Sequence, residues 1–442
     1  MHTHSQRGRL SRLLSLGLIA LAAGAASACN DFLTAENPGA VEEPELNDPA
    51  YANLLANGAI FAFQDAHDDV AYWNGQFVDE IVNRGNISSF IEEGQIDRRE
   101  LHSDMTYINA FLYGPMQRAR FEAEDAVRRL GVILGDTASR DIRVARSHAY
   151  GGYSYVYLGE MMCTTPIDMG APKTSAEIFA DAITHFESAI TIANAAKTYA
   201  GTLTPPSTAL AAAADSVINM ARIGAARAAL DRNEKTRAVE FASQVPAAFE
   251  FRVYYSDNTT AQRNRTYERI GTGSNGWLLG TPFEAMVGDP RIPRIATGTK
   301  AGTPLSPPSY STFNNTVEGA PFGATMSVRV GSGLEARYIV AEAEGPTAAT
   351  LAFVNERRAA GQQDPVDLAG DALMAELREQ RARDFYLDNH RLGDLRRYKE
   401  FYGVDLFPKG PYPGSTTGQV YKEDVACWPL PTNELTGNPN IP

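Results

Sequence analysis

The sequence predicts a mainly α-helical protein in which helices pair as antiparallel hairpins and long irregular loops separate some of them. From Asp141 to Met161, apolar or small residues recur every three or four positions, and the same spacing returns from Thr174 to Ile190. Such a period places these residues on one face of a helix, so each segment is expected to pack on its neighbour. Residues 251–333 are instead rich in Gly, Pro, Ser, Thr and Asn, a composition that predicts loops and not a long helix.

The ends of the first hairpin carry their own signals. Residues 164–172, TTPIDMGAP, contain two prolines and are expected to end the first helix. Thr174 or Ser175 can then cap the second helix, with Glu177 in its first turn. Together these features predict an antiparallel pair joined by a short connection.

Two further hairpins follow. The second begins with a face of small residues, which lets helices approach closely, and turns at residues 231–235. That face consists of Val217, Ala221, Gly224, Ala225 and Ala228. The third is predicted from residues 334–360 and 371–398. We interpret the hairpins, at about residues 140–248 and 334–398, as degenerate tetratricopeptide-like repeats.

The first 28 residues have the order of a secretory signal. Three arginines precede an apolar run at residues 13–23, and residues 26–28 are Ala-Ser-Ala. The run is shorter than the roughly 20 residues that a helix needs to cross a bilayer. We therefore expect residues 1–28 to be a cleaved signal peptide.

Cys29 stands directly behind this signal, in the stretch SACNDFLTAENPG. Small residues followed by a cysteine resemble the signal of bacterial lipoproteins, in which that cysteine is acylated and begins the mature chain; Ala26 stands where Leu is usual. Each buried methylene contributes about 0.8 kcal/mol, so several acyl chains would hold a domain at a membrane. The resemblance predicts lipidation at Cys29.

The charge and the remaining cysteines limit the possible partners and compartments. Loss of residues 1–28 removes three arginines and no acid, which changes the formal charge from −13 to −16. An acidic chain without a basic run is not expected to bind nucleic acid or an anionic lipid surface. Cys163 and Cys427 could pair in an oxidising compartment, but two separate buried thiols is the simpler interpretation.

No catalytic or metal-binding motif stands out. The mature chain has no H-x-x-x-H, H-E-x-x-H or C-x-x-C spacing, no G-x-S-x-G elbow and no Walker loop, so no metal, cofactor or enzymatic activity is expected. His67–Asp69, HDD, is explained more simply as an acidic turn than as a site. Glycosidases need only two carboxylates, so a glycoside hydrolase is kept as an alternative.

Aromatic residues in or beside expected loops suggest a ligand site. A flat ring packs against the apolar face of a sugar, while a few polar groups bind its hydroxyls. The alternative is that these rings fill local cores. The predicted ligand-binding residues are Tyr72, Trp73, Asn74, Arg84, Asn275, Trp277 and Tyr310.

The last seventy residues carry two motifs of a known family. REQRARDFYLDNHRLGDLRRY, Arg378–Tyr398, resembles E-R-A-R-E-L-x-x-E-G-x-R-x-x-D-L-x-R of the SusD/RagB family of nutrient-uptake lipoproteins. The matching residues are Arg381, Arg383, Arg391, Asp394, Leu395 and Arg397. CWPLPTNELTGNPNIP, at the C-terminus, resembles the family's W-P-I-P-x-x-E-x-x-x-N-P through Trp428, Pro429, Pro431, Glu434, Asn438 and Pro439.

The charged motif is interpreted as structural. Arg391 and Asp394 are three residues apart, so on a helix they face one another or a common neighbour. Arg381 or Arg383 is expected to pair with Asp384 or Asp388 around the following bend. We therefore predict an ion network between the last helices and no ligand site there.

The resemblance implies one large SusD-like domain, residues 29–442, with an insert at about 251–333 and a closing segment at 399–442. It further implies a lipid-anchored outer-membrane protein, facing the cell exterior, that binds an oligosaccharide or other nutrient. Such a protein would deliver its ligand to a SusC-like TonB-dependent transporter and would not be an enzyme. A tetratricopeptide-like assembly scaffold at the membrane is the alternative from a different class.

Overall fold

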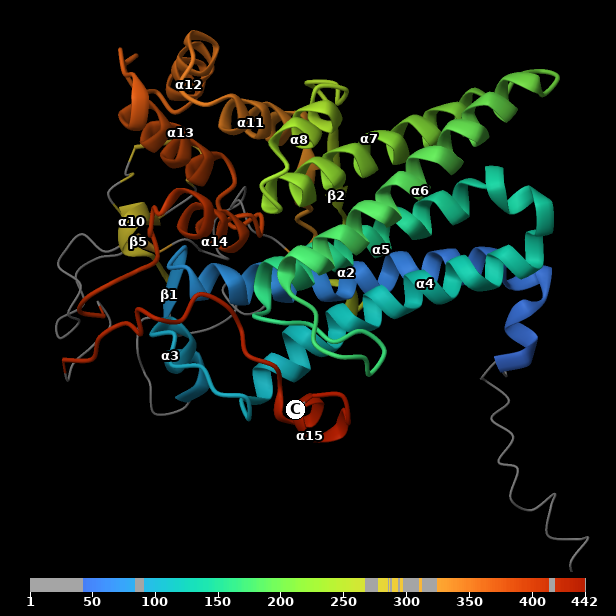
Figure 1. Ribbon diagram of the computed structural model, residues 1–442, viewed down its shortest axis with the longest axis horizontal. Helices are drawn as coiled ribbons and strands as arrows, with labels where there is room; N and C mark the ends of the chain where they lie inside the picture. Colours follow the sequence, from blue (N-terminus) through green and yellow to red (C-terminus); the bar gives the residue numbers. More distant parts are fainter. Residues whose placement is uncertain are drawn as a thin grey trace, which may run out of the picture. The chain divides into compact units, whose positions relative to one another are not determined.

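The structure is a computed structural model that describes residues 43–83, 91–266, 277–284, 286, 288–292, 295–296, 310–311, 324–412 and 418–441 (Figure 1). Residues 1–48 and 49–442 are separate compact units. Of the first, the structure describes the 3₁₀ helix η1 (Glu43–Asn47) and Asp48. The predicted signal peptide and Cys29 lie outside the described residues, and the second unit contains the other described elements.

Helices dominate this unit, which confirms the mainly α class. The α-helices are α2 (Ala52–Phe77), α3 (Ile91–Asp97), α4 (Gly114–Leu134), α5 (Ile142–Met161), α6 (Ser175–Thr202), α7 (Thr208–Asp231), α8 (Lys235–Ala242), α10 (Thr281–Glu284), α11 (Gly333–Glu344), α12 (Ala348–Ala360), α13 (Gly370–Asp384), α14 (Arg391–Tyr402) and α15 (Thr432–Gly437). Short 3₁₀ or π helices are η2 (Pro49–Tyr51), η3 (Ile108–Tyr113), η4 (Gly135–Arg140) and η5 (Thr260–Gln262). The strands are β1 (Ile81–Asn83), β2 (Glu250–Val253), β3 (Trp277–Leu279), β4 (Ile295–Ala296), β5 (Tyr310–Ser311) and β6 (Val328–Ser332).

The long helices form a stack in chain order. In Figure 1, α4, α5, α6 and α7 run side by side, and α2 packs on α4 and α5. The expected pairs α5–α6 and α7–α8 are both present. Their tetratricopeptide-like character stays a prediction. Among the helices that the structure describes, none is both long and apolar enough to cross a bilayer.

The caps of the first hairpin follow the sequence signals. The Asp141 side chain accepts a 2.9 Å hydrogen bond from the Arg143 backbone amide and starts α5. Thr174 and Glu177 form a full capping box at α6, in which Glu177 Oε2 accepts a 2.8 Å hydrogen bond from the Thr174 amide. Each bond satisfies a backbone donor that the first helical turn leaves unpaired.

Close packing between α5, α6 and α7 depends on Phe186. The Phe186 ring lies against Gly152 of α5 and Gly224 of α7. A Cβ added to Gly152 would stand 2.7 Å from the ring, and one added to Gly224 would stand 2.2 Å from it. The glycines therefore let one aromatic ring fill the space between three helices.

The third predicted hairpin is wrong in detail, because each of its two helices is broken. Gly345 has a φ of 80° and precedes Pro346, so α11 ends and α12 starts after the proline. Leu387 and Asn389 have φ of 57° and 60°, which separates α13 from α14. The resulting helices α11, α12 and α13 share a second apolar core, formed by Tyr338, Ala341, Phe353, Val354, Leu373, Leu377 and Phe385.

A disulfide joins Cys163 to Cys427, which corrects the expectation of two separate thiols. Their Cα atoms lie 5.1 Å apart although 264 residues separate them in the sequence. Beside it the Trp428 amide donates to the Met161 carbonyl (2.8 Å), and the Cys163 amide donates to the Trp428 carbonyl (3.0 Å). The closing segment is thus attached to the end of α5 both covalently and through its backbone.

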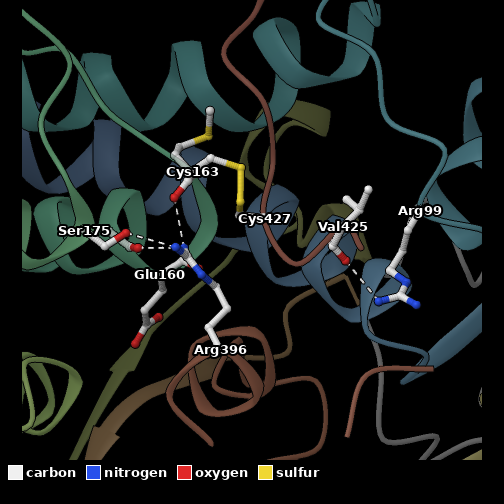
Figure 2. The surroundings of a disulfide bond; sticks show 9 residues. Arg99, Glu160, Cys163, Ser175, Arg396, Val425 and Cys427 are labelled. Carbon is white, nitrogen blue, oxygen red and sulfur yellow. Dashed lines mark hydrogen bonds between the residues drawn. A yellow bond between two sulfur atoms is a disulfide. The ribbon is translucent and has the colours of Figure 1, made fainter. Parts of the chain in front are cut away.

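Two arginines hold the surroundings of the disulfide (Figure 2). Arg396 Nη1 donates to the carbonyl oxygens of Gly159, Glu160 and Met162 at 2.7–2.9 Å, and so satisfies the last carbonyls of α5. Arg99 Nη1 donates to the Val425 carbonyl at 3.0 Å. The chain on both sides of the bridge is therefore fixed by guanidinium groups, of which that of Arg99 is buried and that of Arg396 partly buried.

Candidate ligand-binding site

Tyr72, Trp73 and Asn74 are not beside a loop, so the expected location of these three predicted ligand residues is wrong. They lie within α2, and their exposed fractions are 1%, 0% and 3%. Asn74 Oδ1 accepts a 2.9 Å hydrogen bond from Trp428 Nε1. Because α2 is covered by other elements at this end, the two rings fill the core and leave no face for a ligand.

The four-stranded sheet brings other predicted positions together. Its order is β1-β3-β5-β4, all pairs antiparallel, with Asn83 opposite Trp277 and Ala296 opposite Tyr310. The backbones of the strands that carry Trp277 and Tyr310 are therefore neighbours, and β1 ends one residue before Arg84. Arg84 and Asn275, and the side chains of Trp277 and Tyr310, lie outside the described residues, so this part of the site stays a prediction.

A hollow of about 240 Å³ opens between α2 and the segments that follow β2 and η5; we call it the α2–β2 hollow. One face of α2 lines the hollow, because the α2 residues in its lining are spaced i, i+3, i+4 and i+7. The lining residues are Phe61, Gln64, Asp65, Asp68, Tyr254, Tyr255, Ser256, Gln262, Arg263 and Arg265.

The walls of the hollow are partly aromatic and open to solvent. Tyr254 is 68% exposed and Phe61 is 48% exposed, so both rings present apolar surface to solvent. Tyr255 is less exposed, and its hydroxyl lies 3.5 Å from the Gln64 carbonyl oxygen. Exposed rings beside a few fixed polar groups are a common composition for a ligand-binding surface.

Arg265 forms the polar part of the lining together with carboxyl groups of α2. Its guanidinium donates to Asp69 Oδ2 and Asp65 Oδ1, and its backbone amide donates to Asp68 Oδ2, each at 2.6 Å. Arg118 on α4 also donates to Asp65, at 2.8 Å. These charge-assisted bonds hold the chain after η5 against α2. The segments that carry the exposed rings of Phe61 and Tyr254 are therefore fixed relative to one another.

His67–Asp69 therefore does not form the acidic turn that the sequence suggests. All three side chains are buried within α2. Burial raises the pKa of Asp68 well above its usual range, with the charge of Asp69 adding to the shift. Burial, followed by the charge of Arg227, lowers the pKa of His67 to about 3, so this imidazole is neutral at pH 7.

The chemistry of the hollow fits binding through ring contacts and hydrogen bonds. Asp65 and Asp68 both accept from Arg265, so neither carboxylate is left alone beside the rings. Within the described part of the chain, no three or more His, Cys, Asp or Glu side chains are grouped to hold a metal ion.

Comparisons with known proteins give a consistent answer at the level of the fold. No protein-family model and no curated protein matches the sequence. The structure is similar to that of a SusD superfamily protein from Bacteroides fragilis, with a TM-score of 0.63 at 15% identity, over 89% of this chain and 99% of the other. It is also similar to a laminarin-binding SusD-like protein (TM-score 0.62, 13% identity, 88% and 98% covered) and to surface glycan-binding protein A from Bacteroides uniformis (TM-score 0.61, 13% identity, 88% and 98% covered).

The protein has a SusD-like fold. This confirms the fold that the C-terminal motifs imply.

In this SusD-like fold the charged motif forms a buried network between the last helices, but with different pairs from those expected. Arg381 pairs with Asp394 at 2.7 Å, across from α13 to α14. Arg397 contacts Asp394 at 2.6 Å, Asp231 of α7 at 2.6 Å and Glu342 of α11 at 2.7 Å. The motif thus joins α13 and α14 to two helices that come earlier in the sequence, α7 and α11.

The expected pairing with Asp384 and Asp388 is wrong, because other arginines occupy them. Arg357 of α12 donates to both oxygens of Asp384 at 2.8 Å, and Arg329 of β6 pairs with Asp388 at 2.6 Å. Arg383 pairs with Asp289 at 3.1 Å. A bend that turns α13 away from α14 gives each carboxylate a partner from another element, which spacing alone does not reveal.

The rest of the motif residues also serve the fold. Arg391 donates to the Val78 carbonyl at 3.3 Å and lies over the Phe283 ring at 5.0 Å. Trp428 is fully buried, and Pro429 follows it into the closing segment. Pro431 precedes α15, where its carbonyl accepts a 3.0 Å hydrogen bond from the Glu434 amide.

Sequence reasoning missed the residues that make the hollow. Phe61 looks like an ordinary apolar residue of an amphipathic helix, and the paired Tyr254 and Tyr255 follow a predicted loop boundary without a motif. The available signal is the polar face Gln64, Asp65 and Asp68 around an aromatic, which is unusual for a helix that packs on others.

Proposed function

We propose that the protein binds a glycan through its surface and acts as a receptor without covalent chemistry of its own. The observation that carries this proposal is the α2–β2 hollow, which is lined by the exposed rings of Phe61 and Tyr254 and by Arg265, whose guanidinium is bonded to α2. The SusD-like fold supports it, since similar structures include a laminarin-binding protein and a surface glycan-binding protein.

We further propose that the protein is anchored at the outer membrane by lipid on Cys29 and delivers its ligand to a SusC-like TonB-dependent transporter. The signal-like N-terminus and the C-terminal motifs support this assignment. A Cys29→Ser protein should be found in the soluble fraction while the parent partitions with membranes. Equal partitioning of both would refute the anchor and leave glycan binding open.

Isothermal titration of the mature protein against a panel of oligosaccharides tests the glycan proposal. For the glycan that binds, Tyr254→Ala and Phe61→Ala should each weaken affinity about tenfold, which corresponds to about 1.4 kcal/mol. Val132→Ala is a matched control, because Val132 is 66% exposed on α4 and does not line the hollow. Unchanged affinity in both ring variants would refute the hollow as the site.

A Trp277→Ala variant distinguishes the hollow from the predicted site on the four-stranded sheet. Loss of binding in this variant alone would move the site to the strands β1, β3 and β5. No binding to any glycan would favour the scaffold alternative, and shortened products after prolonged incubation would favour the hydrolase.

A further inference from the structure

Two histidines that are far apart in sequence meet between α5 and α6. His148 Nδ1 and His185 Nδ1 are 3.2 Å apart, and their ring centroids are separated by 5.3 Å. Neither ring is fully buried, and the His185 side chain keeps 17% of its surface exposed. The two nitrogens therefore face each other between two partly buried rings.

A carboxylate on the neighbouring helix sets which nitrogen of His185 carries the proton. Glu124 Oε1 on α4 lies 3.4 Å from His185 Nε2. The same oxygen accepts a 2.6 Å hydrogen bond from the Tyr155 hydroxyl, and Glu124 Oε2 pairs with Arg120 at 2.5 Å. An ionised Glu124 favours the proton on Nε2, which leaves the Nδ1 lone pair of His185 directed at His148.

A glycine lies beside the His185 ring. Gly151 follows His148 by three residues on the same face of α5. A Cβ added there would stand 3.4 Å from His185 Nδ1. Because Gly151 has no side chain, this contact with His185 Nδ1 is not made.

We propose that this pair is a binding site for a divalent transition-metal ion such as Zn²⁺, with His148 Nδ1 and His185 Nδ1 as the two protein ligands. Zinc–nitrogen bonds of about 2.0–2.1 Å in tetrahedral geometry place two ligand nitrogens about 3.4 Å apart. The observed 3.2 Å is close to that separation before any adjustment of the rings. The remaining positions take water or a donor atom of a ligand.

The surrounding groups fit the role. A ligating histidine commonly donates its other N–H to a carboxylate, which is the relation of His185 to Glu124. Imidazole ligands favour Zn²⁺, Cu²⁺ and Ni²⁺ over Mg²⁺ and Ca²⁺, so the site selects a class of ions. Without metal, the same geometry lets one Nδ1–H donate to the other nitrogen, and metal binding replaces that hydrogen bond.

Calorimetric titration of the mature protein with Zn²⁺, after removal of any histidine tag, tests the site. We expect one ion per chain. His148→Asn and His185→Asn should each weaken affinity tenfold or more, and Glu124→Gln should weaken it by about 10–100-fold, as for other outer partners of metal-ligating histidines. His102→Asn is the matched control, because His102 is exposed and lies outside α5 and α6.

A second measurement avoids any dependence on how the variants fold. Electron paramagnetic resonance of the unsubstituted protein with one equivalent of Cu²⁺ should show coupling to two imidazole nitrogens. Absence of stoichiometric Zn²⁺ binding, nitrogen coupling to a single imidazole, or equal affinity in folded His148→Asn and His102→Asn proteins would each overturn the proposal. None of these outcomes depends on whether the protein binds a glycan.

Discussion

Arg381 on α13 donates a 2.7 Å hydrogen bond from Nε to Asp394 Oδ2 on α14, and both side chains are buried. Removing one partner of a buried ion pair leaves the other charge unpaired in a poorly solvated site. Arg381→Met and Asp394→Asn should therefore each lower the free energy of unfolding by about 3–5 kcal/mol, as measured by urea denaturation.

An exposed ion pair supplies the control for that prediction. Arg337 on α11 and Glu356 on α12 pair with side chains that are 41% and 49% exposed. Arg337→Met and Glu356→Gln should each change stability by less than about 1 kcal/mol, because water compensates for the lost partner. Equal losses for the two pairs would contradict the structural role of the buried one.

Stability should also depend on pH through Asp394. Burial alone would raise its pKa, but the guanidinium groups of Arg381 and Arg397 lower it from 3.8 to about 2. The ionised form therefore contributes stability above pH 3.8, and this contribution, about 2 kcal/mol, is lost as the pH falls through 2. Thermal unfolding between pH 5 and 2 should show a smaller decrease for Asp394→Asn than for the parent protein; parallel curves would exclude this carboxylate as a cause.

Reduction of the Cys163–Cys427 disulfide should release the closing segment from α5. A native disulfide typically contributes about 2–5 kcal/mol, so Cys427→Ser should unfold at lower urea concentration than the parent. Fluorescence of Trp428, buried next to the bridge, reports whether the segment separates. A reductant should destabilise the parent and leave a Cys163→Ser/Cys427→Ser protein unchanged; a shift in both would point to another target of the reductant.

The helical part of the fold could be predicted because its signals are local. The apolar period of α5, its Asp141 cap and the capping box of Thr174 and Glu177 all lie within a few residues of the feature they determine. One of the two breaks in the third hairpin is also visible in the sequence, since Gly345 and Pro346 interrupt the period that the prediction extends across them.

The candidate sites could be predicted only in part, because they depend on contacts between distant segments. Trp73 sits near the end of a helical pattern, and whether such a ring is exposed depends on what covers that end. His148 meets His185, and Tyr254 lines the same hollow as Phe61, through the packing of helices and loops that no spacing rule encodes. The C-terminal motif identified the fold without giving the partners of its arginines.

Gly224 lets α6 and α7 approach closely, because the Phe186 ring of α6 lies against it. Gly224→Ala would place a methyl group 2.2 Å from Phe186 Cζ, so the ring or a helix has to move. Alanine favours a helix over glycine by up to about 1 kcal/mol, but overpacking costs about 1–3 kcal/mol, so we expect a net loss of stability. Gly131→Ala on α4, where no atom lies within 4 Å of the added Cβ, should instead stabilise the protein. Urea denaturation of the double variant Gly224→Ala/Phe186→Leu should show a smaller loss than the sum of the single losses, because a smaller side chain relieves the clash; simple additivity would mean that Phe186 is not what limits this approach.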